Sequence, residues 1–424
     1  MRISLLIILF LSTPGLQLQA QDKSYAKQSI YILCSPEMHG RGYVNDGDKF
    51  AAGWIASEFD SHGLENFGDT YFQEYEIAVN TFPGALQFVV GDTLVPGKDY
   101  ILSASSHSVN STFKIKHLRS RKIKRTKILR LKDKLDENTA LVIRKDKYNR
   151  EDYRLLQAIL NVSGGLNAGA VIELTNKKLT HTISDTSYGF AHIIYKTDKK
   201  KIKEKYVSIN IEQELISNYR TQNVIGYIPG SEHPDSFILF SAHYDHLGRM
   251  GKETYFPGAN DDASGVAMVL DLARHYSLPE NRPKFSLVFI TFGAEETGLK
   301  GSKFYTENPL FPIESIRFMI NMDIVGTGSE GLMVVNGRVF EKEYEKFKSI
   351  NDQYDLLPEI KKRGKAANSD HYFFTEQGVH AFFIYTMGGI KAYHDVYDVP
   401  ETLPLNEYDD IFVLITRFTK YLMD

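Results

Sequence analysis

Four short stretches of this sequence place imidazoles or carboxylates after apolar segments, and a fifth places two aspartates at the start of a predicted helix. His243 and Asp245 follow the apolar run "SFILF", and Asp261 stands in "GANDDASG". Further acids and a histidine follow "SLVFITFG", "IRFMIN" and "HAFFIYT": Glu295, Glu296, Asp323 and His394. Without a cation these carboxylates would repel one another, whereas divalent metal ions would remove the repulsion.

The types of side chain favour zinc in an open, catalytic site. The set holds two imidazoles and at least three carboxylates but no thiolate, which suits a Zn²⁺ ion that keeps a position free for water or substrate. Five ligands are too many for one tetrahedral zinc, but two ions that share a carboxylate are a known hydrolytic arrangement. We therefore predict two Zn²⁺ ions per chain.

The spacing of these residues predicts how they divide the work. His243 and Asp245 stand two positions apart on a predicted strand, so Asp245 can accept the second ring N–H of His243. His246 is expected to point the other way and not to bind metal. Of the neighbours Glu295 and Glu296, one is expected to bind metal while the other acts as general base on the hydrolytic water.

The apolar segments before these residues predict the elements that position them. From residue 222 onward, near-continuous apolar strands alternate with helical patterns such as "SGVAMVLDLARHYS" and "NEYDDIFVLITRFTKYL". This alternation predicts an α/β fold with a largely parallel sheet that helices cover on both faces. In such sheets ligands bind beyond the carboxyl ends of the strands, where four of the stretches fall, and the fifth opens the helix that follows the first of these strands.

The first half of the chain has a different character. Residues 25–66 are predicted to be helical, with Phe50, Trp54, Ile55 and Phe59 on one stripe and a stop at Gly63, and 68–92 to be extended or a hairpin. "ALVIR", "YRLLQAILNVSGGLNAGA" and "AVIEL" form a strand–helix–strand unit within a predicted inserted domain, 86–212. The basic stretch 114–134 is interpreted as a solvated face rather than a nucleic-acid site.

The N-terminus predicts export. "MRISLLIILFLSTPGLQLQA" has a positive start, a short apolar core and Ala20 as a cleavage residue, which is typical of a signal peptide over residues 1–20. The protein is therefore expected in the periplasm or outside the cell, without a membrane anchor after cleavage. A formal charge of −3 gives no reason to expect nucleic acid, and the lone Cys34 cannot form an internal disulfide.

These motifs, in this order, resemble the co-catalytic di-zinc aminopeptidases of metallopeptidase family twenty-eight. The resemblance is dense over about 222–400, from "NVIGYIPGSEHPDSFILFSAHYDHLG" through "PGANDDASGVAMVLDLAR", "FITFGAEETGLKGSKFY" and "INMDIVG" to "SDHYFF" and "YHDVYD". It implies a three-layer αβα sandwich with a mixed, mostly parallel sheet. Residues 86–212 are similar to a protease-associated domain, inserted between 21–85 and 213–424 of the catalytic domain.

The family pattern implies a role for each site residue. One zinc is expected on His243, Asp261 and Asp323, and the other on Asp261, Glu296 and His394. Glu295 is the expected general base, Asp245 is expected behind His243, and the Asp261–Asp262 peptide is expected to be cis. Where the family often has threonine after the last ligand this chain has Asp395, while Asp398 keeps the pattern. Asp370 is expected either behind the ligands or, with Ser369, at a helix N-cap.

The function implied is hydrolysis of the N-terminal peptide bond of peptides with free N-termini, through a metal-bridging water that Glu295 activates. A zinc carboxypeptidase or dipeptidase of the same fold would need basic side chains around the substrate carboxylate, for which Lys391 is the nearby candidate. A glutaminyl-cyclase-like acyltransferase would use one zinc, and a receptor-like binding protein would lack ligands or the base. The oligomeric state is left open.

Overall fold

The computed structural model describes residues 22–118, 134–160 and 167–424. The predicted signal peptide, 1–20, and most of the basic stretch 114–134 therefore lie outside the described residues. Within that part of the chain, no helix is both long and apolar enough to cross a membrane.

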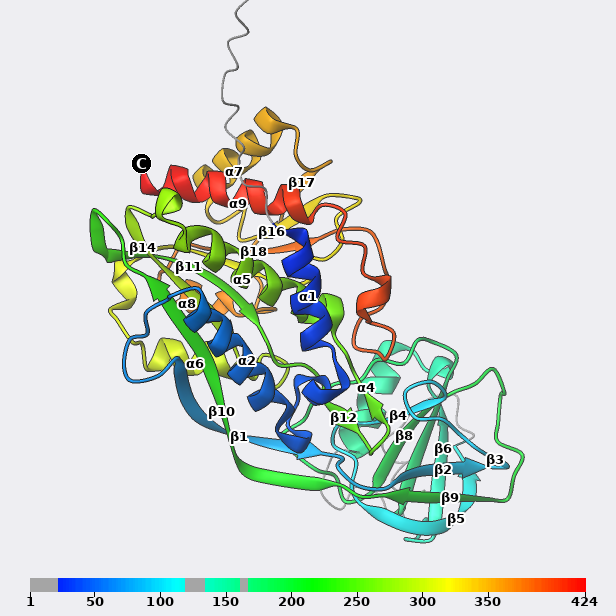
Figure 1. Cartoon of the computed structure of the whole chain (residues 1–424). Coiled ribbons are helices and arrows are strands. Elements are labelled where there is room, and N and C mark those ends of the chain that lie inside the picture. The colour runs from blue at the N-terminus through cyan, green and yellow to red at the C-terminus, as the bar shows by residue number, and fades with distance from the viewer. Residues whose placement is uncertain (1–21, 119–133, 161–166) are drawn as a thin grey trace, which may run out of the picture.

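Two sheets have eight strands each, and the one with the longer strands, which we call the larger sheet, carries the predicted site (Figure 1). Its strands, in spatial order, are β1 (Phe72–Thr81), β10 (Glu214–Ile228), β14 (Phe285–Phe292), β11 (His233–His243), β15 (Ile316–Met322), β18 (Ala381–Thr386), β16 (Leu332–Val335) and β17 (Ile360–Lys362). The central strands β14, β11, β15 and β18 run parallel, whereas β1, β10 and β16 pair antiparallel. The sheet is thus mixed with a parallel centre, as the resemblance implied.

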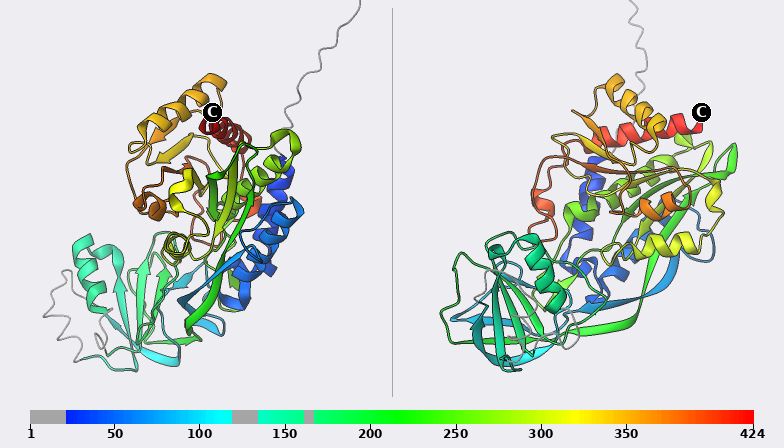
Figure 2. Two further views of the ribbon diagram at one scale, coloured as in Figure 1. Left: turned by 90° about the vertical axis from the view of Figure 1, so that its left-hand side faces the viewer. Right: turned by 180° about the vertical axis from the view of Figure 1, so that it is seen from behind.

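Helices cover both faces of this sheet and make it a three-layer αβα sandwich. Figure 1 shows α1, α2 and α5 in front of the sheet, and the reverse view in Figure 2 shows α6 and α8 on the far side. The helices of the larger sheet are α1 (Lys23–Leu33), α2 (Gly47–Ser61), α5 (Ser264–Ser277), α6 (Lys300–Glu307), α7 (Glu341–Tyr354), α8 (His371–Glu376) and α9 (Tyr408–Met423).

The strand sequences explain the two covered faces. Along β11, Ile238 and Phe240 pack into the core beneath α1, α2, α5, α7 and α9, whereas Phe237 and Leu239 pack into the core beneath α6 and α8. Because successive strand residues point to opposite faces, a strand buried on both sides needs an unbroken apolar run. The run "FILF" meets that need.

A second eight-stranded sheet takes all its strands from residues 86–211. In spatial order they are β3 (Asp92–Thr93), β2 (Leu86–Val90), β9 (Tyr206–Ile211), β5 (Val109–His117), β6 (Thr139–Arg144), β7 (Ala170–Thr175), β8 (Ala191–Lys196) and β4 (Tyr100–Leu102). Helix α4 (Arg150–Leu160) connects β6 to the parallel β7, as the strand–helix–strand pattern predicted. We call residues 86–211 the second-sheet region, and the predicted boundaries of an inserted domain, 86–212, stay a prediction.

Residues 68–92 are extended, as expected: β1 belongs to the larger sheet, whereas β2 pairs antiparallel with β3 in the second sheet. Two other expectations about the elements were wrong. Phe50 is 55% exposed although Ile55 and Phe59 are buried, so the apolar stripe of α2 is narrower than its sequence indicated. Strand β11 ends at His243, so Asp245 and His246 follow in a loop, where the alternation of strand side chains no longer applies.

A buried carboxyl group joins the first turn of α2 to the larger sheet. Asp48 is fully buried and accepts hydrogen bonds from the hydroxyl groups of Tyr219 and Thr221 on β10. Burial, which disfavours the charged form, raises the pKa of Asp48 to about 7 despite these two donors.

We predict that Asp48 lowers the stability of the fold as the pH rises. Because the pKa is higher in the folded than in the unfolded chain, the folded state binds the extra proton between pH ~4 and ~7, and its stabilisation is lost across that range. The free energy of unfolding is measured with urea at pH 5 and at pH 8. Relative to the wild type, the free energy of unfolding of Asp48→Asn should be higher at pH 8 than at pH 5 by about 1 kcal/mol or more. For the exposed control Asp46→Asn, the difference in free energy of unfolding from the wild type should be the same at both pH values. The prediction is wrong if the difference for Asp48→Asn is also the same at both pH values.

Candidate metal centre

Parallel strands bring the predicted site residues to one edge of the larger sheet. His243 ends β11, Glu296 follows β14 and Asp323 follows β15, and these three strands run in the same direction. His394 lies in the loop after β18, which is parallel to β15, and Asp261 lies in the turn before α5. The five side chains therefore meet where the carboxyl ends of the strands meet.

The ligand atoms form two triads that share one aspartate. In the first, Nε2 of His243 lies 3.2 Å from Oδ1 of Asp261 and 3.6 Å from Oδ1 of Asp323. In the second, Nε2 of His394 lies 3.1 Å from Oδ2 of Asp261 and 3.2 Å from Oε2 of Glu296. A cation ~2.1 Å from each atom of a tetrahedral set holds those atoms about 3.4 Å apart, so each triad fits one Zn²⁺-sized ion.

The shared carboxylate lacks the partners that a buried carboxylate needs. Asp261 and Asp323 are buried, yet Oδ2 of Asp261 and Oδ1 of Asp323 accept no hydrogen bond from the described residues. Buried polar atoms are nearly always satisfied, and an imidazole faces each of these two oxygens, Nε2 of His394 at 3.1 Å and Nε2 of His243 at 3.6 Å. Cations held between these imidazoles and carboxylates would satisfy the oxygens.

Asp262 differs from its neighbour because main-chain amides already satisfy it. Its carboxylate lies near His243 and Asp323, within the reach of a metal ligand. However, Oδ1 accepts the N–H groups of Gly265 and Ile324, and Oδ2 accepts the N–H of His243. The peptide bond between Asp261 and Asp262 is cis, as the resemblance implied. Main-chain amides hold the Asp262 carboxylate, whereas Asp261 keeps an oxygen without a hydrogen bond from the described residues.

His246 lies in the cluster, contrary to the expectation that it points away. Its Nδ1 is 2.8 Å from Oε1 of Glu296, and the side chain is fully buried. His246, Asp261 and Glu296 form a further group with metal-ligand spacing. The expectation failed because it applied strand alternation beyond the end of β11. In this position His246 orients Glu296 and leaves Oε2 of that residue to face His394.

Asp245 also has a different role from the one its spacing indicated. Nδ1 of His243 contacts the main-chain carbonyl of Asp245 at 3.0 Å, whereas the Asp245 carboxylate is 3.8 Å away. That carboxylate instead accepts the N–H groups of Glu295 and Glu296 and the hydroxyl of Tyr43. Asp245 thus fixes the backbone that carries both glutamates, while its carbonyl fixes the ring of His243.

Glu295 lines a small pocket together with the ligands. The pocket has a volume of about 220 Å³, and its other walls are Ile324, Asn368, Phe383, Tyr385 and Tyr393. No hydrogen bond holds the Glu295 carboxyl group to the described part of the chain. Burial, together with neighbouring carboxylates, raises the pKa of Glu295 well above its ordinary value. A carboxyl group that is held by its backbone but free at its tip can exchange protons with a molecule in the pocket.

The imidazoles take up positive charge in the absence of metal. Burial would lower the pKa of His394, but Asp261 and Glu296 raise it to about 11. His243 behaves alike, because the surrounding carboxylates outweigh burial and raise its pKa well above the ordinary value. Burial and Asp261 would raise the pKa of Glu296, but the two histidines beside it lower it to about 2. The centre therefore attracts positive charge strongly.

Residues from distant segments hold the Asp261 turn in place. Asp398 accepts the N–H groups of Asn260 and Asp261. The fully buried Arg41 donates to five main-chain carbonyls, those of Leu33, Tyr244, Pro257, Gly258 and Asp261. Sequence reasoning did not identify Arg41, which lies outside the stretch 222–400 where the resemblance is dense. A buried arginine without a carboxylate partner can be recognised only from the structure.

In the "SDHYFF" motif, Ser369 supports a site residue, and the side chain of Asp370 does not cap a helix. Its hydroxyl donates to Oδ2 of Asp323, and Asn321 donates to Ser369 in turn. Asp370 precedes α8 but makes no capping hydrogen bond, so the N-cap alternative was wrong. Burial raises the pKa of Asp370 to about 7. The motif thus positions the free oxygen of Asp323 toward His243.

The second-sheet region contacts the loop that carries His394. Nδ1 of His394 is 3.1 Å from the main-chain carbonyl of His181. In return, the main-chain N–H of His181 donates to the carbonyl of His394. Lys178 pairs with Asp395 at 2.7 Å and donates to the carbonyls of Lys391 and Tyr393. The aspartate that departs from the family pattern therefore has a partner in this chain. No local sequence signal could have identified Lys178 or His181.

The site has two triads that share one aspartate and lie at the carboxyl edge of a mixed sheet in an αβα sandwich. This arrangement is typical of co-catalytic metallopeptidase sites. Residues 223–419 match the family model described as Peptidase family M28. The solved zinc aminopeptidase BSAP from Bacillus subtilis has the same fold, with a TM-score of 0.71 and 20% identity over 95% of each chain. The aminopeptidase from Aneurinibacillus sp. gives a TM-score of 0.64 and 21% identity over 96% of this chain and 94% of that one.

Two relatives are similar in sequence over shorter stretches. Aminopeptidase YwaD of Bacillus subtilis is 29% identical over 246 residues, which is 55% of this chain and 52% of that protein. A "Probable zinc metalloprotease" of Pyricularia oryzae is 38% identical over 116 residues, or 26% of this chain and 23% of that protein. The chain thus matches about half of the first relative and about a quarter of the second.

We predict that Lys178 supports metal retention at the His394 triad. Lys178→Ala should free Asp395 and the His394 loop and raise the rate of zinc loss to a chelator by about tenfold, the low end for residues that support a ligand. The neighbouring Lys177→Ala is the matched control. Asp395→Asn should have the same effect, and the double variant should be no worse than either alone, because both remove one interaction. Additive effects would show that the pair is not the cause.

Proposed function

We propose that this protein is an exported zinc aminopeptidase that removes the N-terminal residue from peptides. The observation that carries the proposal is the shared Asp261, whose two oxygens face one triad each at ligand spacing. Two zinc ions in these triads would polarise the scissile carbonyl and lower the pKa of the attacking water. The relatives named as aminopeptidases and zinc metalloproteases support this reading, and the signal-like N-terminus supports export.

Glu295 is proposed as the general base. Asp245 accepts the Glu295 N–H at 3.0 Å and so directs this residue into the pocket, beside the first triad. From there its carboxylate can take a proton from water at the pocket floor and give it to the departing amine. Asp245 acts through Glu295 and Glu296 and is therefore a positioning residue. His243, Asp261, Glu296, Asp323 and His394 are the proposed zinc ligands.

The size of the pocket favours removal of a terminal residue. A volume of about 220 Å³ is below the usual range for sites that enclose a larger ligand, about 300–1,000 Å³. It accommodates a single side chain next to the triads. The aromatic rings of Phe383, Tyr385 and Tyr393, with Ile324, form the apolar part of its lining.

Two rival functions have less support. A carboxypeptidase for acidic dipeptides needs a cationic side chain at the substrate carboxylate, but the pocket's described lining contains no lysine or arginine. Lys391, the earlier candidate, is exposed, and its carbonyl accepts a hydrogen bond from Lys178. A one-zinc cyclase does not need the second triad, which is nevertheless built from Asp261, Glu296 and His394.

We predict that Glu295→Gln separates catalysis from metal binding. The purified mature protein should hold two zinc ions per chain, and Glu295→Gln should keep both while kcat falls by about 10²–10⁴-fold. The adjacent Glu296→Gln is the matched control and should lose one of the two ions. Metal analysis and kcat on leucyl anilide measure both effects. A Glu295→Gln enzyme with nearly full kcat would disprove the role of the base.

We also predict a preference for apolar N-terminal residues. Leucyl and phenylalanyl anilides should be hydrolysed at least about tenfold faster, in kcat/KM, than glutamyl or lysyl anilides, because the pocket would bury their charge unpaired. N-acetyl-leucyl anilide should not be hydrolysed. Release from the acetylated substrate would argue against exopeptidase action, and a preference for glutamyl substrates would contradict the assignment of the aromatic pocket.

A further inference from the structure

The positive charge of this chain is concentrated in one segment. Residues 86–212 contain 25 lysines and arginines but 13 aspartates and glutamates, so this segment carries a formal charge of +12 within a chain of charge −3. The zinc aminopeptidase proposed above does not require this segregation. Charge of one sign on one segment is a common feature of surfaces that bind an oppositely charged partner.

A large pocket in the second-sheet region collects part of this charge. The pocket has a volume of about 1070 Å³ and lies at the carboxyl ends of the parallel strands β5, β6 and β7, where β9 begins. Its apolar surface includes Val142, Leu174 and Ile202. Six lysines surround this surface: Lys114, Lys147, Lys200, Lys201, Lys203 and Lys205. The carboxyl edge of parallel strands is a common place for ligands in α/β sheets.

These lysines lack partners among the described residues. None of the six side chains has an ion pair or a hydrogen bond with that part of the chain, whereas Lys178 and Lys362 elsewhere each pair with a carboxylate. Among the described lining residues Glu204 is the one carboxylate, and it accepts the main-chain N–H of Lys203. An anion in the pocket would therefore meet several cations that the described residues leave uncompensated.

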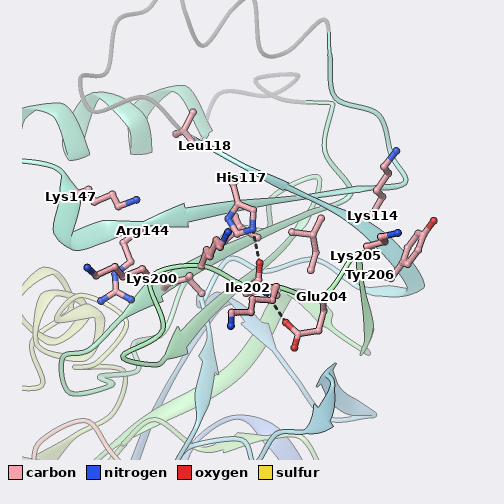
Figure 3. Close-up of a pocket in the computed structure, with 15 residues that line it drawn as sticks. Lys114, His117, Leu118, Arg144, Lys147, Lys200, Ile202, Glu204, Lys205 and Tyr206 are labelled. Atoms are coloured by element: carbon pink, nitrogen blue, oxygen red, sulfur yellow. Dashed lines mark hydrogen bonds between the residues drawn. The ribbon is translucent and has the colours of Figure 1, made fainter.

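Buried contacts fix the walls of the pocket. The guanidinium of Arg144 donates to the carbonyls of Thr197 and Lys199 and to the carboxylate of Asp146, which ties the lysine-bearing loop to the end of β6. His117, at the end of β5, is 2.9 Å from the carbonyl of Ile202. Figure 3 shows this contact in the middle of the pocket. The loop that presents the lysines is thus held to the sheet at two places.

The distribution of the cations indicates the kind of anion. Figure 3 shows Lys147 and Lys200 on one side of His117 and Lys114 and Lys205 on the other. A compact phosphate is bound best by a convergent arginine fork, but Nε of Arg144 already donates to Asp146 and Nη1 to the carbonyls of the loop. Separate ammonium groups around an apolar floor match several spaced carboxylates on a chain that also has apolar side chains.

We propose that this pocket binds an acidic peptide segment that combines carboxylates with apolar residues. The site is distinct from the candidate metal centre, and the proposal does not rest on hydrolysis. For an aminopeptidase, such a pocket would hold a part of a protein substrate away from the bond that is cleaved.

The test measures binding without catalysis. A short peptide of glutamates and two leucines, acetylated at its N-terminus and labelled at its C-terminus, is titrated with the full mature protein by fluorescence anisotropy. A glutamine peptide of the same length, a sulfated oligosaccharide and a single-stranded oligonucleotide serve as competitors. The acetyl group removes the free amine, so failure of the aminopeptidase proposal would leave this measurement unaffected.

The charge of the pocket is then reversed. Lys201→Glu with Lys203→Glu should weaken binding of the glutamate peptide by at least about tenfold, and the milder Lys200→Gln with Lys201→Gln by several-fold. The control Lys27→Glu with Lys342→Glu changes the net charge equally at exposed positions away from the pocket. Thermal unfolding verifies that each variant folds.

The expected result is binding of the glutamate peptide that weakens between about 50 and 200 mM salt and is lost only in the pocket variants. Equal binding of the glutamine peptide would overturn the proposal, as would equal losses in the control variant. Displacement of the peptide by far lower concentrations of the sulfated oligosaccharide or the oligonucleotide would also overturn it and assign the pocket to that polyanion.

Discussion

Electrostatic repulsion between buried carboxylates is the constraint on which the rest of this structure depends. The edge of the larger sheet holds many more carboxylates than imidazoles, and most are buried. The chain treats these carboxylates in two ways. Asp245, Asp262 and Asp398 receive main-chain N–H groups, which neutralise no charge but satisfy their oxygens. Asp261 and Asp323 keep a bare oxygen each, and those oxygens face the imidazoles.

This division explains why neighbouring residues of the same type behave differently. In the pair Asp261–Asp262, one side chain is left for cations and the other organises the turn. In the pair Glu295–Glu296, His246 fixes one carboxylate, while the other has a free tip in the pocket. In both pairs the role of a side chain is set by the amides and imidazoles around it. The residue type alone does not determine that role.

Much of the fold and the membership of the site could be predicted from sequence. Apolar runs such as "FILF" can be buried on both faces only in the centre of a covered sheet, and parallel strands bring their ends together, so His243, Glu296 and Asp323 had to be neighbours. The shape of the local backbone could not be predicted in this way. His246 and Asp245 lie past the last residue of β11, where the two-residue period no longer says which way a side chain points.

Contacts between distant segments were also out of reach. The hydrogen bond from Arg41 to Asp261 spans 220 residues, and the contact of His394 with His181 spans 213. Neither residue has a neighbour in sequence that indicates its partner. Asp395 is instructive, because it looked like a departure from a family pattern and is instead one half of an ion pair with Lys178.

The origin of the ligands in the chain makes the two triads unequal. All three residues of the first triad lie between His243 and Asp323, and Arg41, Ser369 and Asp398, which support them, also lie outside the second-sheet region. The second triad also needs His394, whose loop is held by the second-sheet region. A metal ion binds only after the segments that carry its ligands have folded together, and binding then stabilises those segments. A cation at the first triad would therefore need only the larger sheet to have formed, whereas a cation at the second triad would be held firmly only after both sheets have docked.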